Sequence, residues 1–133
     1  MFGFLKKQDA KKGRAQVKRA PGGTIRDRDL AELAAWVQGR EGIEGFVEPE
    51  TFVNEMSIVL VDKSGEHIRR LLGGPKGIDV VANALGISIY DVEETGYPQR
   101  MRDRIEQDRL IRRRLAYQER KEKLRDEQAD RES

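Results

Sequence analysis

The longest uninterrupted apolar run of the chain, residues 58–61 (IVLV), ends directly before its clearest turn signal, residues 62–66 (DKSGE). This signal is typical of a three-residue hairpin loop that closes with a glycine in the left-handed region. The sequence therefore predicts a β-hairpin around the turn. Its expected cross-strand pairs are Asp62 with Glu66, Leu60 with Ile68, Ile58 with Arg70 and Met56 with Leu72.

The two strands have an apolar face and a mixed face, because neighbouring side chains of a strand point to opposite sides of the sheet. The apolar face comprises Phe52, Met56, Ile58, Leu60, Ile68 and Leu72. The mixed face comprises Glu55, Ser57, Val59, Val61, His67, Arg69 and Leu71. A hairpin alone is marginally stable in water, so another element should cover the apolar face. Substitutions on the mixed face should cost less stability.

Two amphipathic helices are expected to cover the apolar face. Apolar residues recur at helical spacing in both, as Leu30, Leu33, Ala34 and Val37 and as Ile78, Val81, Ala82 and Leu85. Thr24 is expected to cap the first helix, which should end at Gly39 or Gly42. Gly86 is expected to end the second. Trp36 lies off the first stripe, so it should cover the edge of the core rather than anchor a partner.

Two shorter segments complete the expected domain. Residues 43–50 predict a short extended piece that stops at Pro49. Residues 87–95 are ambiguous, because short apolar runs fit strands and helices alike. A strand that returns to the sheet is favoured for them, and the alternative is a short helix capped by Ser88.

Residues 99–133 contain no Gly or Pro and are rich in helix formers, so they predict one long helix that frays near its end. One side of this helix is expected to dock on the domain and carries Met101, Ile105, Ile111 and Leu115. The other side carries a thin apolar seam of Leu110, Tyr117 and Leu124. Because Arg114 and Lys121 interrupt the seam, it is too broken to predict a coiled coil.

The fold class that follows is α+β, with a small antiparallel sheet built on the hairpin, two short helices and a long basic C-terminal helix. Of the 133 residues, 37% are hydrophobic and 38% are charged, so the chain has room for one small domain with a small core. We expect a disordered basic tail over residues 1–23, the domain over residues 24–98 and the charged helix over residues 99–133.

The absence of cysteine excludes disulfides, thiolate catalysis and cysteine-based metal sites. The N-terminus lacks the apolar region of a secretory signal, and no stretch approaches the ~20 apolar residues of a membrane-spanning helix. We therefore expect a cytoplasmic protein. No pattern in the sequence indicates a cofactor.

The distribution of charge predicts a binding function. Residues 1–20 contain seven basic residues and one acidic residue. Residues 21–98 contain seven basic and fourteen acidic residues, and residues 99–133 contain twelve basic and nine acidic residues. Basic ends favour RNA, a ribonucleoprotein or an acidic protein as the partner of a non-enzymatic adaptor. The candidate contact residues are Arg113, Arg114, Arg120, Lys121, Lys6, Lys7, Lys11 and Lys12. A solvated helix laced by ion pairs is the alternative explanation of the helical charges.

Two other functions stay open as alternatives. Phe2, Phe4 and Leu5 precede a lysine pair, an arrangement typical of segments that touch an anionic membrane surface. His67, the only histidine, would be the general base of a small enzyme, although no nucleophile or second metal ligand accompanies it.

Two further patterns are interpreted as structural. Residues 78–95 match the apolar spacing of a helix-turn-helix, but the expected recognition helix carries Asp91, Glu93 and Glu94 and no basic residue. DNA would repel such a helix. Residues 73–77 (GGPKG) lack the full pattern of a phosphate-binding P-loop, so a helix-entry turn is favoured there.

Two runs, Phe46-Val47-Glu48-Pro49 and residues 96–103 (GYPQRMRD), resemble segments of a family of small actinobacterial proteins of unknown function. The resemblance covers the middle of the chain and the start of the long helix. It implies no defined activity and no functional residue. Some such proteins bear a general oxidoreductase name, which this sequence does not support because it has neither a cysteine pair nor the GxGxxG pattern of dinucleotide-binding proteins.

Overall fold

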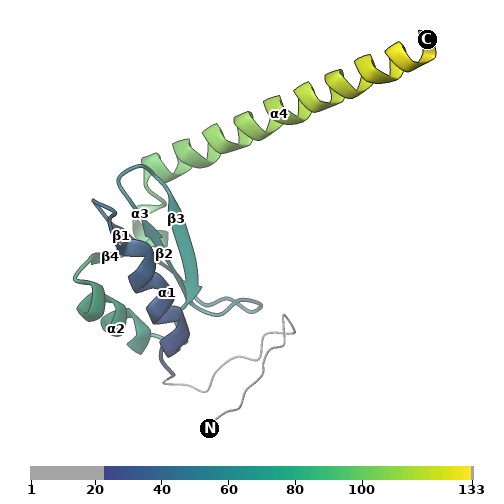
Figure 1. The fold of residues 1–133 in the computed structure, drawn as a ribbon. Helices are drawn as coiled ribbons and strands as arrows, with labels where there is room; N and C mark the ends of the chain where they lie inside the picture. Colours follow the sequence, from purple (N-terminus) through teal and green to yellow (C-terminus); the bar gives the residue numbers. More distant parts are fainter. Residues whose placement is uncertain (1–22, 133) are drawn as a thin grey trace.

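The computed structural model describes residues 23–132, which form a four-stranded sheet, two helices on one of its faces and a long helix that leaves the domain (Figure 1). The sheet order is β3-β2-β1-β4. In chain order the elements are α1 (Asp27–Val37), β1 (Glu44–Glu48), β2 (Ser57–Val61), β3 (His67–Leu71), α2 (Lys76–Leu85), β4 (Ser88–Asp91), α3 (Val92–Thr95) and α4 (Gln99–Glu132).

The predicted α+β class is confirmed, but the sheet is mixed, whereas an antiparallel sheet was expected. β1 and β2 pair antiparallel, as do β2 and β3, whereas β4 pairs with β1 in parallel. The strand favoured for the ambiguous segment is therefore present. A helical turn, α3, follows it directly, and the Asp91 carboxylate caps this turn by accepting from the amide of Glu93 at 2.8 Å. Ser88 lies in the strand and caps nothing.

The hairpin between β2 and β3 has the predicted register. Ile58 pairs with Arg70 and Leu60 pairs with Ile68. Gly65 has a φ of +94°, in the left-handed region that the turn requires and that side chains other than glycine rarely adopt. The apolar pattern and the turn residues thus predicted the same pairing, and that pairing is the one observed.

A first core lies between the sheet and the helices α1 and α2. Its fully buried members include Leu33, Ile58, Leu60, Leu72 and Val81. Trp36 packs at the edge of this core, and the Arg40 guanidinium lies over its ring, 4.1 Å from the centroid. The prediction that Trp36 covers the edge of the core is confirmed.

The mixed face of the hairpin is buried as well, in a second core. Val59 and Val61 are fully buried there with Phe46 and Met101, and Tyr97 packs against them. β2 is consequently buried at all five positions, since helices α1 and α2 cover one face and the start of α4 covers the other. This burial contradicts the expectation that the mixed face tolerates substitution.

Two further expectations are corrected near the domain edge. Phe52 is 97% exposed, because β2 has not yet begun there and the residue lies in the loop after β1. The N-cap residue of α1 is Arg26 rather than the expected Thr24, because the helix starts at Asp27; Arg26 is extended and makes no side-chain cap. Ile25 is buried in the first core, so the chain is still extended at the point where the helix was expected to begin.

Helix α4 is uninterrupted, as predicted, but only its start docks on the domain. Met101 is 3% exposed, whereas Ile105, Ile111 and Leu115 on the same side are 43%, 50% and 53% exposed. Every residue from 109 to 132 is exposed, and the helix projects away from the sheet (Figure 1). The predicted docking side is therefore correct for Met101 and wrong for the later residues.

Candidate functional site

The start of α4 packs directly on the hairpin turn. A Cβ atom on Gly65 would lie 2.1 Å from the carbonyl oxygen of Arg100, too close for any side chain. Arg100 also donates from Nε to the carbonyl oxygen of Asp62 at 2.9 Å and from Nη2 to Glu44 at 2.7 Å. Gly65 is thus required both by the turn and by the close approach of α4.

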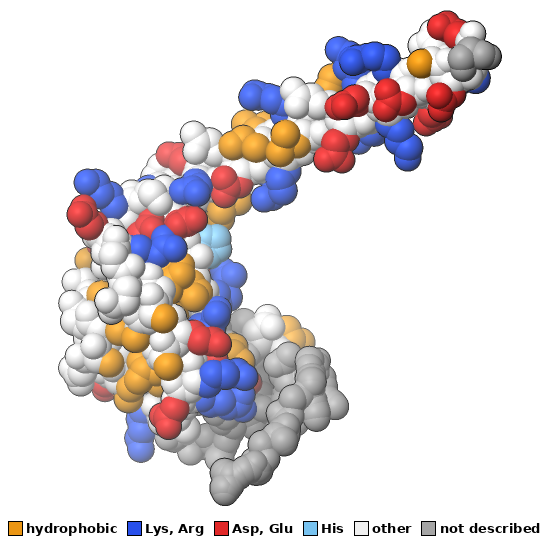
Figure 2. Space-filling model, in the orientation of Figure 1, with side chains coloured by type: hydrophobic (Ala, Val, Ile, Leu, Met, Phe, Trp, Pro, Cys, Tyr) orange, Lys and Arg blue, Asp and Glu red, His pale blue; other side chains and the backbone are white. Residues whose placement is uncertain are grey.

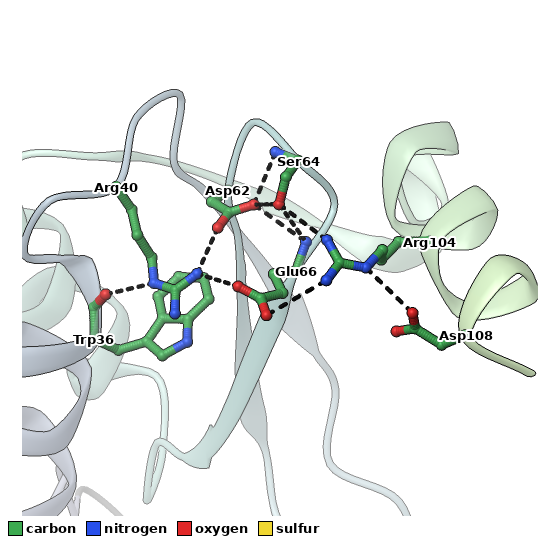
Figure 3. Close-up of polar contacts among 7 residues, drawn as sticks. All are labelled: Trp36, Arg40, Asp62, Ser64, Glu66, Arg104 and Asp108. Atoms are coloured by element: carbon green, nitrogen blue, oxygen red, sulfur yellow. Dashed lines mark hydrogen bonds and ion pairs between the residues drawn. The ribbon is translucent and has the colours of Figure 1, made fainter. Parts of the chain in front are cut away.

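A cluster of ion pairs joins α1, the hairpin turn and α4 (Figure 3). Arg40 donates from Nη1 to Asp62 at 2.6 Å and also to Glu66. From the other side, Arg104 pairs with Glu66 at 3.6 Å and with Asp108 at 3.3 Å. Glu66 therefore lies between Arg40, in the loop after α1, and Arg104 of α4, and it links the two segments at the hairpin turn.

Asp62 organises the turn within this cluster. One of its carboxylate oxygens accepts from the Ser64 amide at 2.8 Å, from the Ser64 hydroxyl at 2.7 Å and from the Glu66 amide at 3.1 Å. Burial alone raises the pKa of Asp62, but the hydrogen bonds from Ser64, Arg40 and the backbone outweigh it and hold the pKa below its usual value. The cluster therefore forms a joint between the hairpin turn and the start of α4, in which the charged groups pair with one another.

Beyond this joint lies the arm of α4, residues 109–132. Hydrophobic, basic and acidic side chains are interspersed along its surface (Figure 2). A helix without tertiary packing depends on local pairs and on its own propensity. The arm thus presents its whole circumference to a partner, and the order of its side chains decides which partner fits.

One side of the arm combines an apolar seam with basic flanks. Leu110, Tyr117 and Leu124 are 47%, 57% and 62% exposed. Their seven-residue spacing keeps them in line, with a drift of about 20° per repeat. Arg113 and Arg114 follow Leu110 by three and four residues, and Arg120 and Lys121 follow Tyr117 in the same way. Positive charge therefore lines both edges of the seam. The seam side comprises Leu110, Arg113, Arg114, Tyr117, Arg120, Lys121 and Leu124.

The four basic residues predicted as contacts on α4 therefore lie together on the seam side. Within residues 23–132, no hydrogen bond or salt bridge engages any of them, and the ion pairs of α4 lie earlier, at Arg104–Asp108 and Glu106–Arg109. The helix offers four charged groups whose hydrogen-bonding capacity is unused by the described part of the chain.

The opposite side of the arm is acidic. Its residues follow one another at spacings of four, three and four, which places them on the side of the helix that faces away from the seam. This acidic side comprises Leu115, Glu119, Glu122 and Asp126, and two basic residues, Arg112 and Lys123, lie at its margin. The arm therefore has two sides of opposite charge, and a charged partner can distinguish between them.

A shallow hollow of about 490 Å³ lies where the arm meets the hairpin turn. Its lining includes Ser64 of the turn and Arg104, Gln107 and Leu110 of α4. The seam begins at this hollow, because Leu110 belongs to both. A partner that follows the seam toward the domain thus reaches a recess rather than a blocked surface.

A second candidate site is a hollow of about 690 Å³ beside the loop that joins β1 and β2. The Glu48 carboxylate in its wall accepts from Arg69 at 2.7 and 2.9 Å, from the Ser57 hydroxyl at 2.6 Å and from the Tyr97 hydroxyl. Partial burial raises the pKa of Glu48, but these hydrogen bonds lower it to about 2. Because the four groups satisfy one another, this network is interpreted as structural.

The other residues considered from sequence do not assemble into a site. His67 lies in β3 opposite Val61, as the register predicted, and no group of metal-binding side chains occurs within residues 23–132. A Cβ on Gly74 would lie 2.7 Å from the carbonyl oxygen of Gly23, and one on Gly77 would lie 2.4 Å from a carbonyl oxygen as well. Close packing therefore explains the glycines of the helix-entry turn.

Some predicted contacts fall on parts of the chain that the structure leaves undescribed. Residues 1–22 contain Lys6, Lys7, Lys11 and Lys12 as well as the apolar start of the chain. The predictions of a disordered tail, of partner contact through these lysines and of membrane contact through Phe2, Phe4 and Leu5 all lie outside the described residues.

Sequence reasoning missed the polar networks that position α4.

The run Phe46–Pro49 and the run 96–103 are far apart in the chain, yet they meet in the structure. Phe46 and Met101 share the second core, and Tyr97 donates to Glu48. The two runs that carry the resemblance are therefore one packed unit, a relation that no spacing within either run shows.

None of the protein-family models, curated proteins or solved structures compared with the chain matches it. No helix within residues 23–132 is both long and apolar enough to cross a membrane. The resemblance to small actinobacterial proteins stays a prediction.

Proposed function

We propose that the protein is a non-enzymatic binding or adaptor protein whose docking element is the arm of α4. The observation that carries this proposal is the seam side, where three large apolar side chains stay about half exposed between basic residues. Exposed apolar patches rimmed by polar residues mark interaction sites, and the seam is a narrow surface of this kind in which basic residues separate the three side chains. RNA, a ribonucleoprotein and an acidic protein are the partner classes that its charge favours.

The joint at the start of α4 supports this proposal. A docking helix transmits a partner's position to the domain only when it is fixed at its base. The contacts of Arg100 and Arg104 with the hairpin turn, and the burial of Met101, provide that fixation. The domain then holds the arm in place, and the arm binds the partner.

Removing the arm tests the proposal. A chain that ends at residue 108 keeps Met101, Arg100 and Arg104, so its domain should melt within a few degrees of the full chain. We expect a crosslinked pull-down from native extract to capture a partner with the full chain and to lose it with the shortened chain. The pull-down is repeated after nuclease treatment and with residues 1–23 deleted, to separate nucleic acid from protein and arm from tail. Equal capture by the full and shortened chains would contradict the proposal.

A further inference from the structure

We infer that the partner of the arm is an acidic amphipathic α-helix, which packs along the seam and places its carboxylates beside the flanking basic residues. The inference rests on the proposed function and names its partner class. It follows from three features of the arm: the line of apolar residues, the charges on both edges of that line, and the opposite charge on the far side.

The apolar line fits a helix better than it fits RNA. Three residues at seven-residue spacing extend over roughly 21 Å at 1.5 Å per residue. Helices that pack on one another repeat two core positions every seven residues. The seam supplies apolar side chains at one of these positions, and Arg114 and Lys121 occupy the other. RNA phosphates would satisfy the arginines but would leave Leu110 and Leu124 in water. Base stacking would use only Tyr117, the single aromatic residue of the arm.

The flanking charges specify an acidic partner. Residues beside a helix–helix seam choose the partner through interhelical ion pairs. Residues 109–121 carry six basic residues and one acid, and each edge of the seam is basic in this stretch. Carboxylates of a partner helix would pair with these basic groups. An amphipathic helix whose apolar face has acidic flanks is therefore complementary to the seam side, whereas an amphipathic helix with basic flanks is repelled.

A second copy of this chain is not complementary. An antiparallel pair that aligns Leu110 with Leu124 and Tyr117 with Tyr117 would place Arg113 beside Lys121 of the other copy. Parallel pairing would likewise set the basic edges of the two helices side by side. Like charges at these positions disfavour association, so the arm selects a different chain.

The far side and the end of the arm define where the partner lies. Glu119 and Glu122 belong to the acidic side, which would repel an acidic helix. Residues 122–132 carry five acids and three basic residues, so negative charge also dominates the end of the arm. The most acidic stretch of the partner is therefore expected opposite residues 109–121, on the seam side.

A designed peptide tests the inference with the full chain. The probe is a fluorescein-labelled peptide of four heptads with leucine at the two core positions and glutamate at the flanking positions, titrated by fluorescence anisotropy. We expect salt-dependent binding that Arg113→Glu with Arg120→Glu weakens at least tenfold. The matched control, Arg112→Glu with Lys123→Glu, reverses two charges away from the seam and should change affinity less than threefold. A peptide with lysine in place of glutamate should bind the seam double variant better than it binds the wild type.

The contribution of the apolar line is measured separately. Leu110→Ala with Leu124→Ala should weaken peptide binding at least tenfold and leave binding of single-stranded poly(U) RNA unchanged. Failure of the wild type to bind the peptide, or equal losses in the seam and control variants, would overturn the inference. If poly(U) binds and the peptide does not, the inference fails and the proposed adaptor function stands. If the shortened chain also captures the same partner as the full chain, both fail.

Discussion

Leu60→Ala should lower the free energy of unfolding by about 2–5 kcal/mol, the range for truncating a buried leucine. Leu60 is fully buried in the first core, beneath α1 and α2, so the lost methyl groups leave a cavity that these elements fill incompletely. The change is measured by chemical denaturation with the full chain. A loss below about 1 kcal/mol would show that the core between hairpin and helices is loosely packed.

The other face of the same strand provides the comparison. Val59→Thr keeps the shape of the side chain but places a hydroxyl in the second core, where it should cost about 1–3 kcal/mol. Val53→Thr makes the same chemical change in the exposed loop, since Val53 is 69% exposed, and should stay within about 0.5 kcal/mol of the wild type. Equal effects at Val59 and Val53 would contradict the burial of both faces of β2.

Glu48→Gln should destabilise the domain at neutral pH by about 1–3 kcal/mol, because the hydrogen bonds that lower the pKa of Glu48 to about 2 stabilise its charged form, and solvent screening at this partly exposed site reduces their energy. Glutamine cannot carry the charge that pairs with Arg69, and the arginine then loses its partner in the wall of the hollow. The matched control is Glu94→Gln at an exposed position of α3, which should change stability by less than about 0.5 kcal/mol.

The effect of Glu48 should depend on pH in one direction. Its pKa is lower in the folded protein than in the unfolded chain, so its stabilisation is fully present above about pH 4.5 and is lost as the pH falls toward 2. The difference in unfolding free energy between the wild type and Glu48→Gln should therefore shrink over this interval. Denaturation curves at several pH values measure it, and a difference that does not change between pH 7 and pH 2.5 would exclude an ionised Glu48 in the network.

The elements with strong local signals were predictable from the sequence. The hairpin register followed from the apolar run and from Gly65, because a turn type and an alternating pattern agreed on one pairing. The helix stripes around Leu33 and Val81 likewise indicated the first core. The candidate contacts Arg113 and Arg120 could be grouped with the seam by spacing alone.

Contacts between distant parts of the chain were not predictable in the same way. The mixed face of the hairpin contains polar residues, so its burial depends on Met101 arriving from α4, about forty residues later. The pairing of Glu48 with Tyr97 depends on the parallel placement of β4, which the ambiguous segment did not determine. Apolar spacing also could not show that α4 leaves the domain. Met101 and Ile105 are both apolar and lie on the same side of the helix, although only Met101 is buried.

The claim that a partner protein docks on the seam side of the arm is tested most directly by photo-crosslinking. A benzoylphenylalanine is placed either at Tyr117, on the seam, or at Leu115, on the acidic side, two positions with nearly the same exposure of 57% and 53%. After irradiation in native extract, we predict a protein adduct at position 117 that survives nuclease treatment, and only background at position 115. Equal adducts at the two positions, or an adduct at 115 alone, would contradict the account.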